Sequence, residues 1–527
     1  MTTTANDSPT RWPRLLVLLP VLLGMVPLNA CEAETDPEGS FPAQFLWGAA
    51  VAGFQVDMGC PTLDASECLD PNSDWYVWVT TQTLIDEEGN HLSGDPLEGG
   101  PGHWELYETD FDLAAGELGM TAFRTSIEWS RIFPQSTVGV DGHEDLTNVA
   151  NMDAVAHYRA MFQAMRDRGL RPFVTLHHYT IPRWMHDAVG CHEDLDGCSP
   201  RGWLDRETMV AEIAKYSGFV ARELGDLVDQ WITQNEPFAV ILAGYLLPSE
   251  DRTNPPGVGL AFEEVKAVAT AMIEAHARMY DAVQDGDLED ADGDGVPAET
   301  GLVFSVVPAH PIDPSKEDDV TAAENVLYLY NLAFLNGVIL GELDEDLDGV
   351  SEFRVDLANR MDFLGVNYYS VLEVEGRPYA VLPDLSPLMT FDPFTFNINW
   401  DAPSGIYEAV TLIRDLYPGL PMFITENGFG DAEDTPGARK YLVEHLTWLS
   451  RAIRDGADVR GYFYWSLIDN YEWNHGYGMR FGLYGIDPTD PSKTRHARPV
   501  VDDYRRIIEA GRIPDELLRS YPVPALP

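Results

Sequence analysis

The amino-acid sequence predicts a single (β/α)8 barrel, on three observations. Eight short apolar runs alternate with longer, often amphipathic stretches, which is the pattern of parallel strands joined by helices. No tandem repeat or low-complexity linker interrupts the alternation. A chain of 527 residues fits one such domain, because barrels commonly exceed the usual domain size.

The strands and helices can be placed along the chain from their periodicity. Helices are predicted at residues 152–169, 208–224 and 441–454, the last with Leu442, Leu446 and Leu449 spaced along one face. The eight predicted strands are residues 45–50, 122–127, 172–178, 228–236, 302–307, 362–369, 422–426 and 459–466.

Strands 4 and 7 each deliver a glutamate at the C-terminal end. Glu236 is followed by Pro237, which cannot donate to a sheet ladder and so marks the exit of strand 4. Glu426 ends strand 7, shortly before Gly428. Active sites of barrels lie at this face. Two carboxyl groups about 5 Å apart are what retaining hydrolysis of a glycosidic bond requires.

The two strand ends, TQNEP at residues 233–237 and ITENG at 424–428, together resemble the family 1 glycoside hydrolases. This is the β-glucosidase and β-galactosidase family, and the resemblance runs from about Phe41 to about Ile513. The segments AGFQ at 52–55 and DWYVW at 74–78 are most similar to its archaeal-type β-glycosidases.

The resemblance implies a role for each glutamate. Glu236 would be the acid in the first step and the base in the second, while Glu426 would be the nucleophile. Such a division needs a raised pKa for Glu236 and a low one for Glu426. Arg124 and Tyr369 match residues beside the nucleophile, where a fixed cation would keep Glu426 ionised.

Further residues match the sugar-binding positions of the family. Tyr179 stands where the family usually has Trp, and a phenol there would preserve packing and add a hydrogen-bond partner. The implied contacts are Gln55 with the 3- and 4-hydroxyls, His178 with the 3-hydroxyl, Asn235 with the 2-hydroxyl, Tyr369 with the nucleophile, Trp465 beneath the ring, Glu472 and Trp473 with the 4- and 6-hydroxyls, and Phe481 near the 6-position.

The implied activity is that of a retaining, exo-acting β-glycosidase. It would remove terminal β-D-glucosyl, β-D-galactosyl or β-D-fucosyl residues and would require no cofactor. A non-catalytic sugar-binding lipoprotein is the alternative from another class, although a binder has no need of both Glu236 and Glu426. Within the family, Glu472 would repel the 6-phosphate of a phospho-glycosidase substrate. A myrosinase-like enzyme would be expected to lack Glu236.

The N-terminus predicts export. Arg11 and Arg14 precede an apolar run at residues 15–27 that is too short to span a membrane. The segment ends in LNAC, which resembles a bacterial lipoprotein cleavage box with Cys31 as the lipidated residue. Ordinary signal cleavage is the alternative, giving a periplasmic or secreted protein. The predicted segments are an export signal (1–30), a tether (31–40), the barrel domain (41–515) and a C-terminal tail (516–527).

Cysteine content agrees with an oxidising compartment. Of five cysteines, Cys31 leaves an even four, which allow three connectivities. The local pairs Cys60–Cys68 and Cys191–Cys198 are favoured, and disulfides persist outside reducing compartments. The spacing within neither pair is that of a Cys-x-x-Cys zinc motif.

The charge balance limits the partners. The chain has 34 basic and 86 acidic residues, a formal net charge of −52, so it would repel nucleic acid. We expect a β-glycoside as the substrate, and a membrane contact only through a lipid at Cys31.

Two acidic loops resemble the opening of a calcium-binding loop. Residues 290–295 and 344–349 carry Asp at alternate positions and then Gly. Loop position 12 holds Gly301 or Val355 in place of the usual Glu. Both loops lead from a helix towards the next strand, on the face away from the two glutamates. Structural calcium and a solvated acidic loop both remain open, the candidate ligands being Asp290, Asp292 and Asp294, and Asp344, Asp346 and Asp348.

Overall fold

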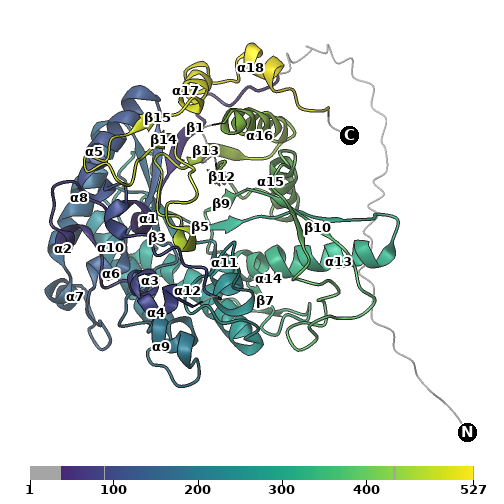
Figure 1. Ribbon diagram of the computed structural model, residues 1–527, viewed down its shortest axis with the longest axis horizontal. Coiled ribbons are helices and arrows are strands. Elements are labelled where there is room, and N and C mark those ends of the chain that lie inside the picture. The colour runs from purple at the N-terminus through teal and green to yellow at the C-terminus, as the bar shows by residue number, and fades with distance from the viewer. Residues whose placement is uncertain (1–36, 88, 431–434, 526–527) are drawn as a thin grey trace, which may run out of the picture. The chain divides into compact units, whose positions relative to one another are not determined.

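The computed structural model describes residues 37–87, 89–430 and 435–525. Within them eight strands close into a barrel in the order β1-β13-β12-β9-β5-β4-β3-β2 (Figure 1). All neighbouring strands of the barrel pair in parallel. The predicted (β/α)8 barrel is therefore confirmed. Its strands are β1 (Leu46–Ala50), β2 (Ala122–Ser126), β3 (Arg171–His177), β4 (Gln230–Asn235), β5 (Glu299–Ser305), β9 (Phe363–Asn367), β12 (Met422–Asn427) and β13 (Val459–Trp465).

Helices occupy the connections between the strands. The long ones include the three predicted from periodicity, with ends shifted by up to four residues. They are α5 (His103–Phe111), α8 (Met152–Asp167), α10 (Arg206–Leu224), α12 (Phe262–Gly286), α13 (Glu317–Leu327), α15 (Gly405–Leu416), α16 (Gly437–Arg454) and α17 (Val500–Ala510). The short ones are α1 (Gly53–Asp57), α2 (Ala65–Cys68), α3 (Asp74–Thr80), α4 (Gln82–Ile85), α6 (Trp129–Ile132), α7 (His143–Val149), α9 (Ala188–Glu193), α11 (Pro237–Ile241), α14 (Ala333–Leu335) and α18 (Asp515–Ser520).

Smaller sheets outside the barrel were not anticipated by the sequence analysis. The largest has three strands in the order β11-β10-β6 and extends the segments that follow β5 and β9. Strands of two to four residues are too short to show a periodic pattern. They are β6 (Ala309–Pro311), β10 (Val371–Val374) and β11 (Asn397–Asn399), with the two-stranded pairs β7 (Glu342–Leu343) with β8 (Glu352–Phe353) and β14 (Tyr484–Gly485) with β15 (His496–Ala497).

Aromatic side chains fill the interior of the barrel. The ring of Phe173 lies 4.8 to 6.2 Å from the rings of Phe363, Phe423 and Phe463, in edge-to-face geometry. All four belong to a buried cluster of their own. Because these rings fill the interior of the barrel, the polar side chains that point inward lie at the ends of the strands.

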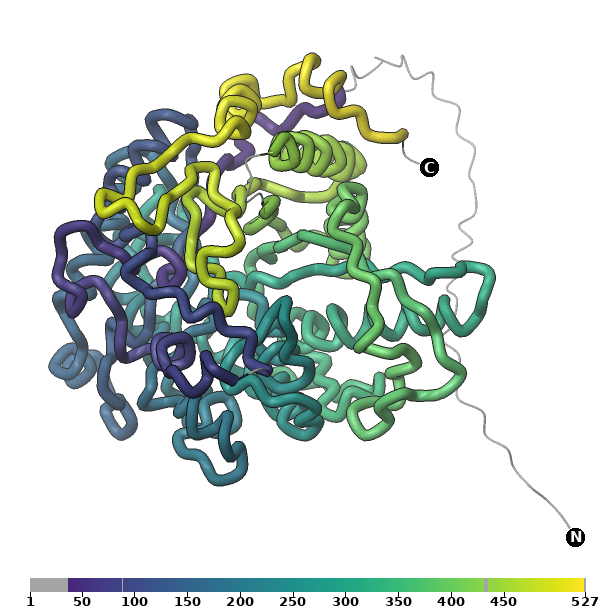
Figure 2. The backbone as a smooth tube through the Cα atoms, viewed as in Figure 1, coloured from purple at the N-terminus to yellow at the C-terminus, as the bar shows by residue number. Residues whose placement is uncertain are grey.

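The segment after the first barrel strand, β1, lies beside the segment after the last, β13. Figure 2 shows the late, yellow segment running beside the early, purple one. Lys493 Nζ donates to the carbonyl of Glu98 at 2.9 Å, and Arg495 Nη1 donates to that of Pro101 at 2.9 Å. These contacts hold the loops after β1 and β13 together.

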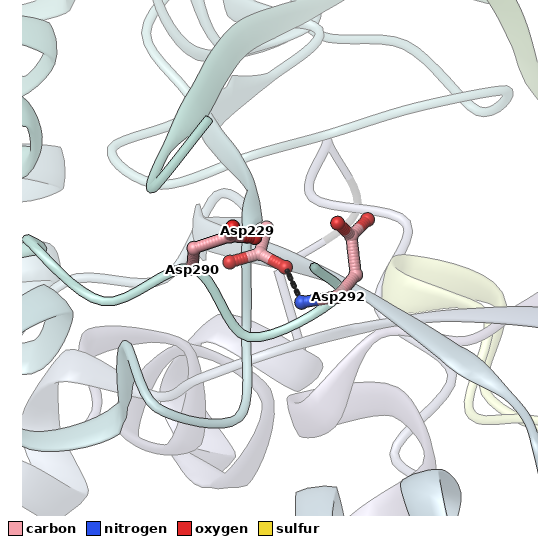
Figure 3. Close-up of side chains that lie close together, drawn as sticks. All are labelled: Asp229, Asp290 and Asp292. Carbon is pink, nitrogen blue, oxygen red and sulfur yellow. Dashed lines mark hydrogen bonds between the residues drawn. The ribbon is translucent and has the colours of Figure 1, made fainter. Parts of the chain in front are cut away.

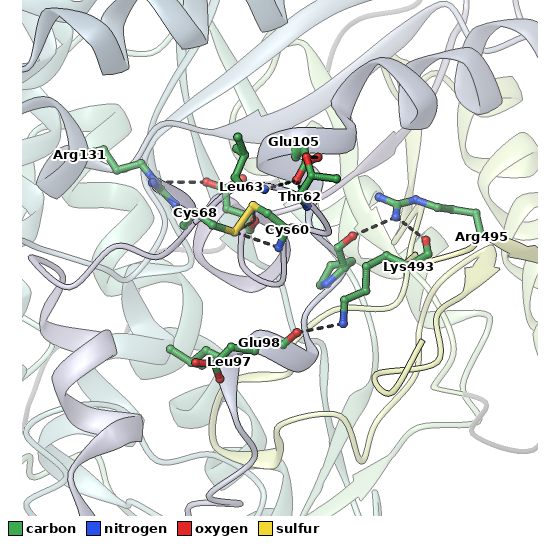
Figure 4. The surroundings of a disulfide bond; sticks show 12 residues. Cys60, Thr62, Leu63, Cys68, Leu97, Glu98, Glu105, Arg131, Lys493 and Arg495 are labelled. Atoms are coloured by element: carbon green, nitrogen blue, oxygen red, sulfur yellow. Dashed lines mark hydrogen bonds and ion pairs between the residues drawn. A yellow bond between two sulfur atoms is a disulfide. The ribbon is translucent and has the colours of Figure 1, made fainter. Parts of the chain in front are cut away.

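The two predicted disulfides are present. Cys60 and Cys68 are joined with an S–S distance of 2.03 Å, and Cys191 and Cys198 with 2.05 Å. Figure 4 shows the first beside Arg131, whose Nη2 donates to the carbonyl of Cys68 at 2.6 Å. Among the described helices, none is long and apolar enough to cross a bilayer. The export signal and Cys31 lie outside the described residues.

Candidate active site

Glu236 and Glu426 lie at the ends of β4 and β12, the fourth and seventh barrel strands in sequence, as predicted. Glu426 is the fifth residue of β12 and is buried. Glu236 directly follows β4 with φ +42°, a left-handed backbone that is uncommon for a residue other than glycine. Its N–H donates to the carbonyl of Val303 at 2.9 Å, and Pro237 begins α11 immediately after it. The carboxylate of Glu236 is thus turned out of the strand at a fixed point.

Arg124 and Tyr369 hold the carboxylate of Glu426. Arg124 Nη1 donates to Oε1 at 2.6 Å, and the Tyr369 hydroxyl donates to Oε2 at 2.9 Å. Arg124 is fully buried in β2, and its Nη2 donates to Asn235 Oδ1 at 2.7 Å. Each oxygen of Glu426 therefore has a donor that the resemblance had placed there.

The low pKa expected for Glu426 is not found. Burial raises the pKa of this carboxyl group to about 7, while the Arg124 guanidinium lowers it and the neighbouring Glu236 raises it. Desolvation outweighs the ion pair because nearly all water is excluded from around the carboxylate. The buried cation is what keeps the pKa of Glu426 from rising further.

Glu236 has neutral donors where Glu426 has a cation. Asn367 Nδ2 donates to Glu236 Oε1 at 2.8 Å, and the hydroxyl of Tyr179 donates to Oε2. Asn367 Nδ2 also lies 3.3 Å from Asn235 Oδ1. A chain of hydrogen bonds thus connects the two carboxylates through Asn367, Asn235 and Arg124.

Asn367 was not predicted as a site residue, although it stands at the same strand end as Tyr369. Its Oδ1 accepts from Thr425 Oγ1 at 2.7 Å, which fixes the direction of its amide. A carboxamide at the C-terminal end of a barrel strand was the available signal.

A second group of polar side chains lies around Glu472. Gln55 Nε2 donates to Glu472 Oε2 at 2.9 Å and also to Asn470 Oδ1 at 3.2 Å. Arg252 Nη2 donates to Glu472 Oε1 at 2.9 Å. Gln55, Glu472 and the adjacent Trp473 are buried. Arg252 was not predicted, since a lone cation in the long segment after β4 has no pattern that marks it.

Aromatic rings connect this group to the glutamates. His178 lies 6.2 Å from Trp465 and 6.0 Å from Trp473 in near-parallel arrangement, and its Nε2 is 3.1 Å from Asn235 Nδ2. Tyr179 packs against Trp473 at 4.8 Å. Phe481 packs, like Tyr369, against the barrel cluster that contains Trp465. The predicted sugar-binding residues thus lie in one network of contacts with the glutamates. Gln55, for example, reaches Glu236 through Glu472, Arg252, Trp473 and Tyr179.

Comparison with known proteins identifies the group to which this arrangement belongs. Residues 37–512 match Glycosyl hydrolase family 1. The chain belongs to this family. It is 34% identical to the β-galactosidase of Pyrococcus woesei, over 91% of this chain and 100% of that protein. It is 29% identical to β-glucosidase A of Thermotoga maritima, over 85% and 93%. The crystal structure of the β-glycosidase from Thermosphaera aggregans superposes with a TM-score of 0.76 at 31% identity, covering 92% of this chain and 100% of that one.

Membership of glycosyl hydrolase family 1 supports retaining hydrolysis of β-glycosides. The named relatives include both β-galactosidases and β-glucosidases. They therefore support a β-glycosidase without distinguishing the two sugars.

The acidic loop at residues 290–295 directly precedes β5 and so lies at the opposite strand ends. The loop at residues 344–349 was predicted there too, but Glu345 pairs with Arg206 at the start of α10, and the carbonyl of Leu347 accepts from Ser386, which follows β10.

Within the described part of the chain, Asp229, Asp290 and Asp292 lie close together (Figure 3), and one carboxylate oxygen of each is within 4.8 Å of those of the other two. Asp294, the third predicted ligand of the 290–295 loop, is not among these three residues. Its carboxylate caps the backbone N–H of Val296 at 2.8 Å, and Asp229, which precedes β4, takes the third place. The second group has the predicted members Asp344, Asp346 and Asp348.

Proposed function

We propose that the protein is a retaining, exo-acting β-glycosidase that removes terminal β-D-glucosyl and β-D-galactosyl residues, with β-glucosides as its main substrates. The observation that carries the proposal is the asymmetric environment of the two glutamates. Glu426 is paired with a buried cation at 2.6 Å, whereas Glu236 contacts only neutral donors among the described residues. Such a difference suits one carboxylate that attacks and one that holds a proton.

In the first step an Oε atom of Glu426 attacks the anomeric carbon of the sugar. The bond from that carbon to the glycosidic oxygen breaks, and this oxygen takes the proton of Glu236. The products are an ester between Glu426 and the sugar, and the released alcohol. Arg124 and Tyr369 stabilise the negative charge on Glu426 before the attack.

In the second step water enters from the side that the alcohol has left. Glu236, now ionised, removes a proton from the water, and the oxygen attacks the anomeric carbon. The bond to Glu426 breaks, the sugar leaves with its β-configuration, and Glu236 is protonated again. No step requires a metal or an organic cofactor.

The exo mode is supported by the burial of the residues assigned to the non-reducing sugar. Gln55, Glu472 and Trp473 are all at most 5% exposed, and they would surround the 3-, 4- and 6-positions of the sugar. A further sugar attached at those positions would have to displace these buried side chains. The family resemblance assigns this end to the non-reducing sugar.

A panel of nitrophenyl glycosides tests the proposal. We expect turnover of the β-glucoside, β-galactoside and β-fucoside, none of the α-glucoside, and the β-anomer of glucose as the first product by NMR. A non-catalytic sugar-binding protein would bind glucose or cellobiose and release no nitrophenol from any of them. An α-anomer as first product would contradict retention.

We also propose that the protein is exported and carries a lipid on Cys31, in the cell envelope. The support is the sequence LNAC after the apolar run, together with the two disulfides among the described residues. Labelling of cells with a radioactive fatty acid should mark the protein, and Cys31→Ser should remove the label. Export without label would leave ordinary signal cleavage.

A further inference from the structure

Arg252 places a cation in the proposed sugar pocket that the mechanism above does not use. Its Nη2 donates to Glu472, and its guanidinium carbon lies 6.0 Å from the centre of a Trp473 ring. About 30% of the side chain is exposed, yet Nη1 is shielded from solvent and donates to no residue that the structure describes. A donor removed from water without an acceptor is costly, more so when it is charged. A bound molecule that supplies an acceptor would remove this cost.

The segment that carries Arg252 is fixed to the loop that carries Glu472 and Trp473. Asn474 Nδ2 donates to the carbonyl of Glu250 at 3.1 Å, and Asn474 Oδ1 accepts from the N–H of Thr253 at 3.4 Å. The His475 ring is 2.9 Å from the carbonyl of Asp251. Both neighbours of Arg252 are therefore held, and the guanidinium is positioned before any ligand arrives.

The two oxygens of Glu472 face different neighbours. Oε2 accepts from Gln55, and Oε1 accepts from Arg252. If Gln55 holds the 3- and 4-hydroxyls, as the proposed function has it, Oε1 and Arg252 are on the side of the 6-position. A sugar hydroxyl is both donor and acceptor. One at this point can donate to Glu472 and accept from Arg252 Nη1.

We propose that Arg252 is a specificity-determining residue that binds the 6-oxygen of the glycone through Nη1. The inference rests on the proposed function and adds a contact to it. It makes the pocket selective for hexosides over pentosides, because a β-xyloside has no group on carbon 5 to accept this hydrogen bond.

The test compares a β-glucoside with a β-xyloside on Arg252→Met, which keeps the length of the side chain and removes its donors. We expect kcat/KM for nitrophenyl β-glucoside to fall about 10- to 100-fold, and that for nitrophenyl β-xyloside to change less than about threefold. Arg252→Lys keeps the charge near Glu472 and should lie between. Arg460→Met is the matched control, since Arg460 is half exposed at the opposite end of β13 and pairs with Asp458.

Arg252 could instead act only by holding Glu472. In that case Arg252→Met would have no further effect on the glucoside to xyloside ratio in a Glu472→Gln background, and the inference would be overturned. We expect the ratio to fall in that background as well. An equal loss on both substrates in the single variant would also contradict the contact.

A binding measurement keeps this test separate from the proposed function. Calorimetry with the iminosugar isofagomine, and with its analogue lacking the hydroxymethyl group, reads the contact without turnover. Arg252→Met should lose most of the preference for isofagomine. An unchanged preference would refute the role of Arg252 even if the enzyme hydrolyses β-glucosides. Failure of the wild type to hydrolyse any β-glycoside would refute the proposed function alone.

Discussion

Carboxylates gather at both ends of this barrel, but their partners differ. At the C-terminal ends of the strands, Glu426 is held by the side chains of Arg124 and Tyr369. At the N-terminal ends, Asp229 accepts from the backbone N–H groups of Ala291 and Asp292, at 2.8 and 2.6 Å. Burial raises the pKa of both carboxyl groups, to about 7 for Glu426 and about 6 for Asp229.

The difference shows what distinguishes a reactive carboxylate from a structural one. A raised pKa alone does not, because both ends have it. The end proposed for catalysis also has a buried cation, Arg124, and a second glutamate, Glu236, in the same hydrogen-bond network as Glu426. One carboxyl group can therefore attack while the other transfers a proton. Backbone amides at the other end hold the loop in place and provide no proton donor that could be exchanged.

The largest expected effect comes from removing Glu426. Glu426→Gly should lower kcat/KM on nitrophenyl β-glucoside by at least about 10⁴-fold, because no covalent intermediate can form. Asp294→Asn, in the loop before β5 at the other end of the barrel, is the matched control and should retain full activity. Loss of activity in both variants with intact folding would erase the distinction between the two ends.

Removing the cation should have the next largest effect. Arg124→Met leaves the Glu426 carboxyl buried without its partner, so kcat/KM should fall about 10³-fold. Since the pKa of Glu426 is about 7 with Arg124 present, the wild-type kcat/KM should decline below about pH 7. The acidic limb should move to higher pH in Arg124→Met, because loss of the cation raises this pKa further. Arg124→Lys should restore the position of the limb in part, and an unmoved limb would show that Glu426 does not govern it.

A smaller effect is expected at Tyr179. Tyr179→Phe removes the hydroxyl that donates to Glu236, and kcat should fall about 10-fold. Tyr407→Phe removes a similar hydrogen bond, to the surface residue Asp455 at 2.9 Å, and should leave kcat unchanged.

The smallest effect concerns the acidic loops. If they hold structural calcium, its addition should raise the Tm by about 2 °C at pH 7 with no change in kcat. The rise in Tm should become smaller below about pH 6, because the pKa of Asp229 is about 6 and protons then compete with calcium for its carboxylate. Asp344→Asn should reduce the rise. A Tm insensitive to calcium and chelator would identify these loops as solvated acidic turns.

The features of the fold and of the site that could be predicted from the sequence are those whose residues lie close together in the chain. Glu236 and Glu426 each stand in a strand-end motif, and the disulfide partners are near neighbours in the chain. What could not be predicted depends on distant segments meeting. The contact between Arg252 and Glu472 joins residues 220 positions apart.

The acidic loop at residues 290–295 shows the same limit. Its alternating pattern indicated Asp294 as a ligand, but the fold brings in Asp229 from the start of β4. The loop is attached to Asp229 by two backbone hydrogen bonds, and no local pattern contains that attachment. Asn367 and Tyr179 each stand at a predicted strand end, but only the structure shows that both donate to Glu236.

The central claim is that Glu426 attacks the sugar and Glu236 transfers the proton, and azide tests it most directly. Glu236→Ala, given a β-glucoside with a good leaving group, should form the glycosyl-enzyme and stall, because the base for hydrolysis is missing. Azide needs no base and should restart turnover, yielding the β-glucosyl azide. With Glu426→Gly, azide should occupy the space of the missing carboxylate and yield the α-glucosyl azide. An α-azide from Glu236→Ala together with a β-azide from Glu426→Gly would contradict the assignment of both residues.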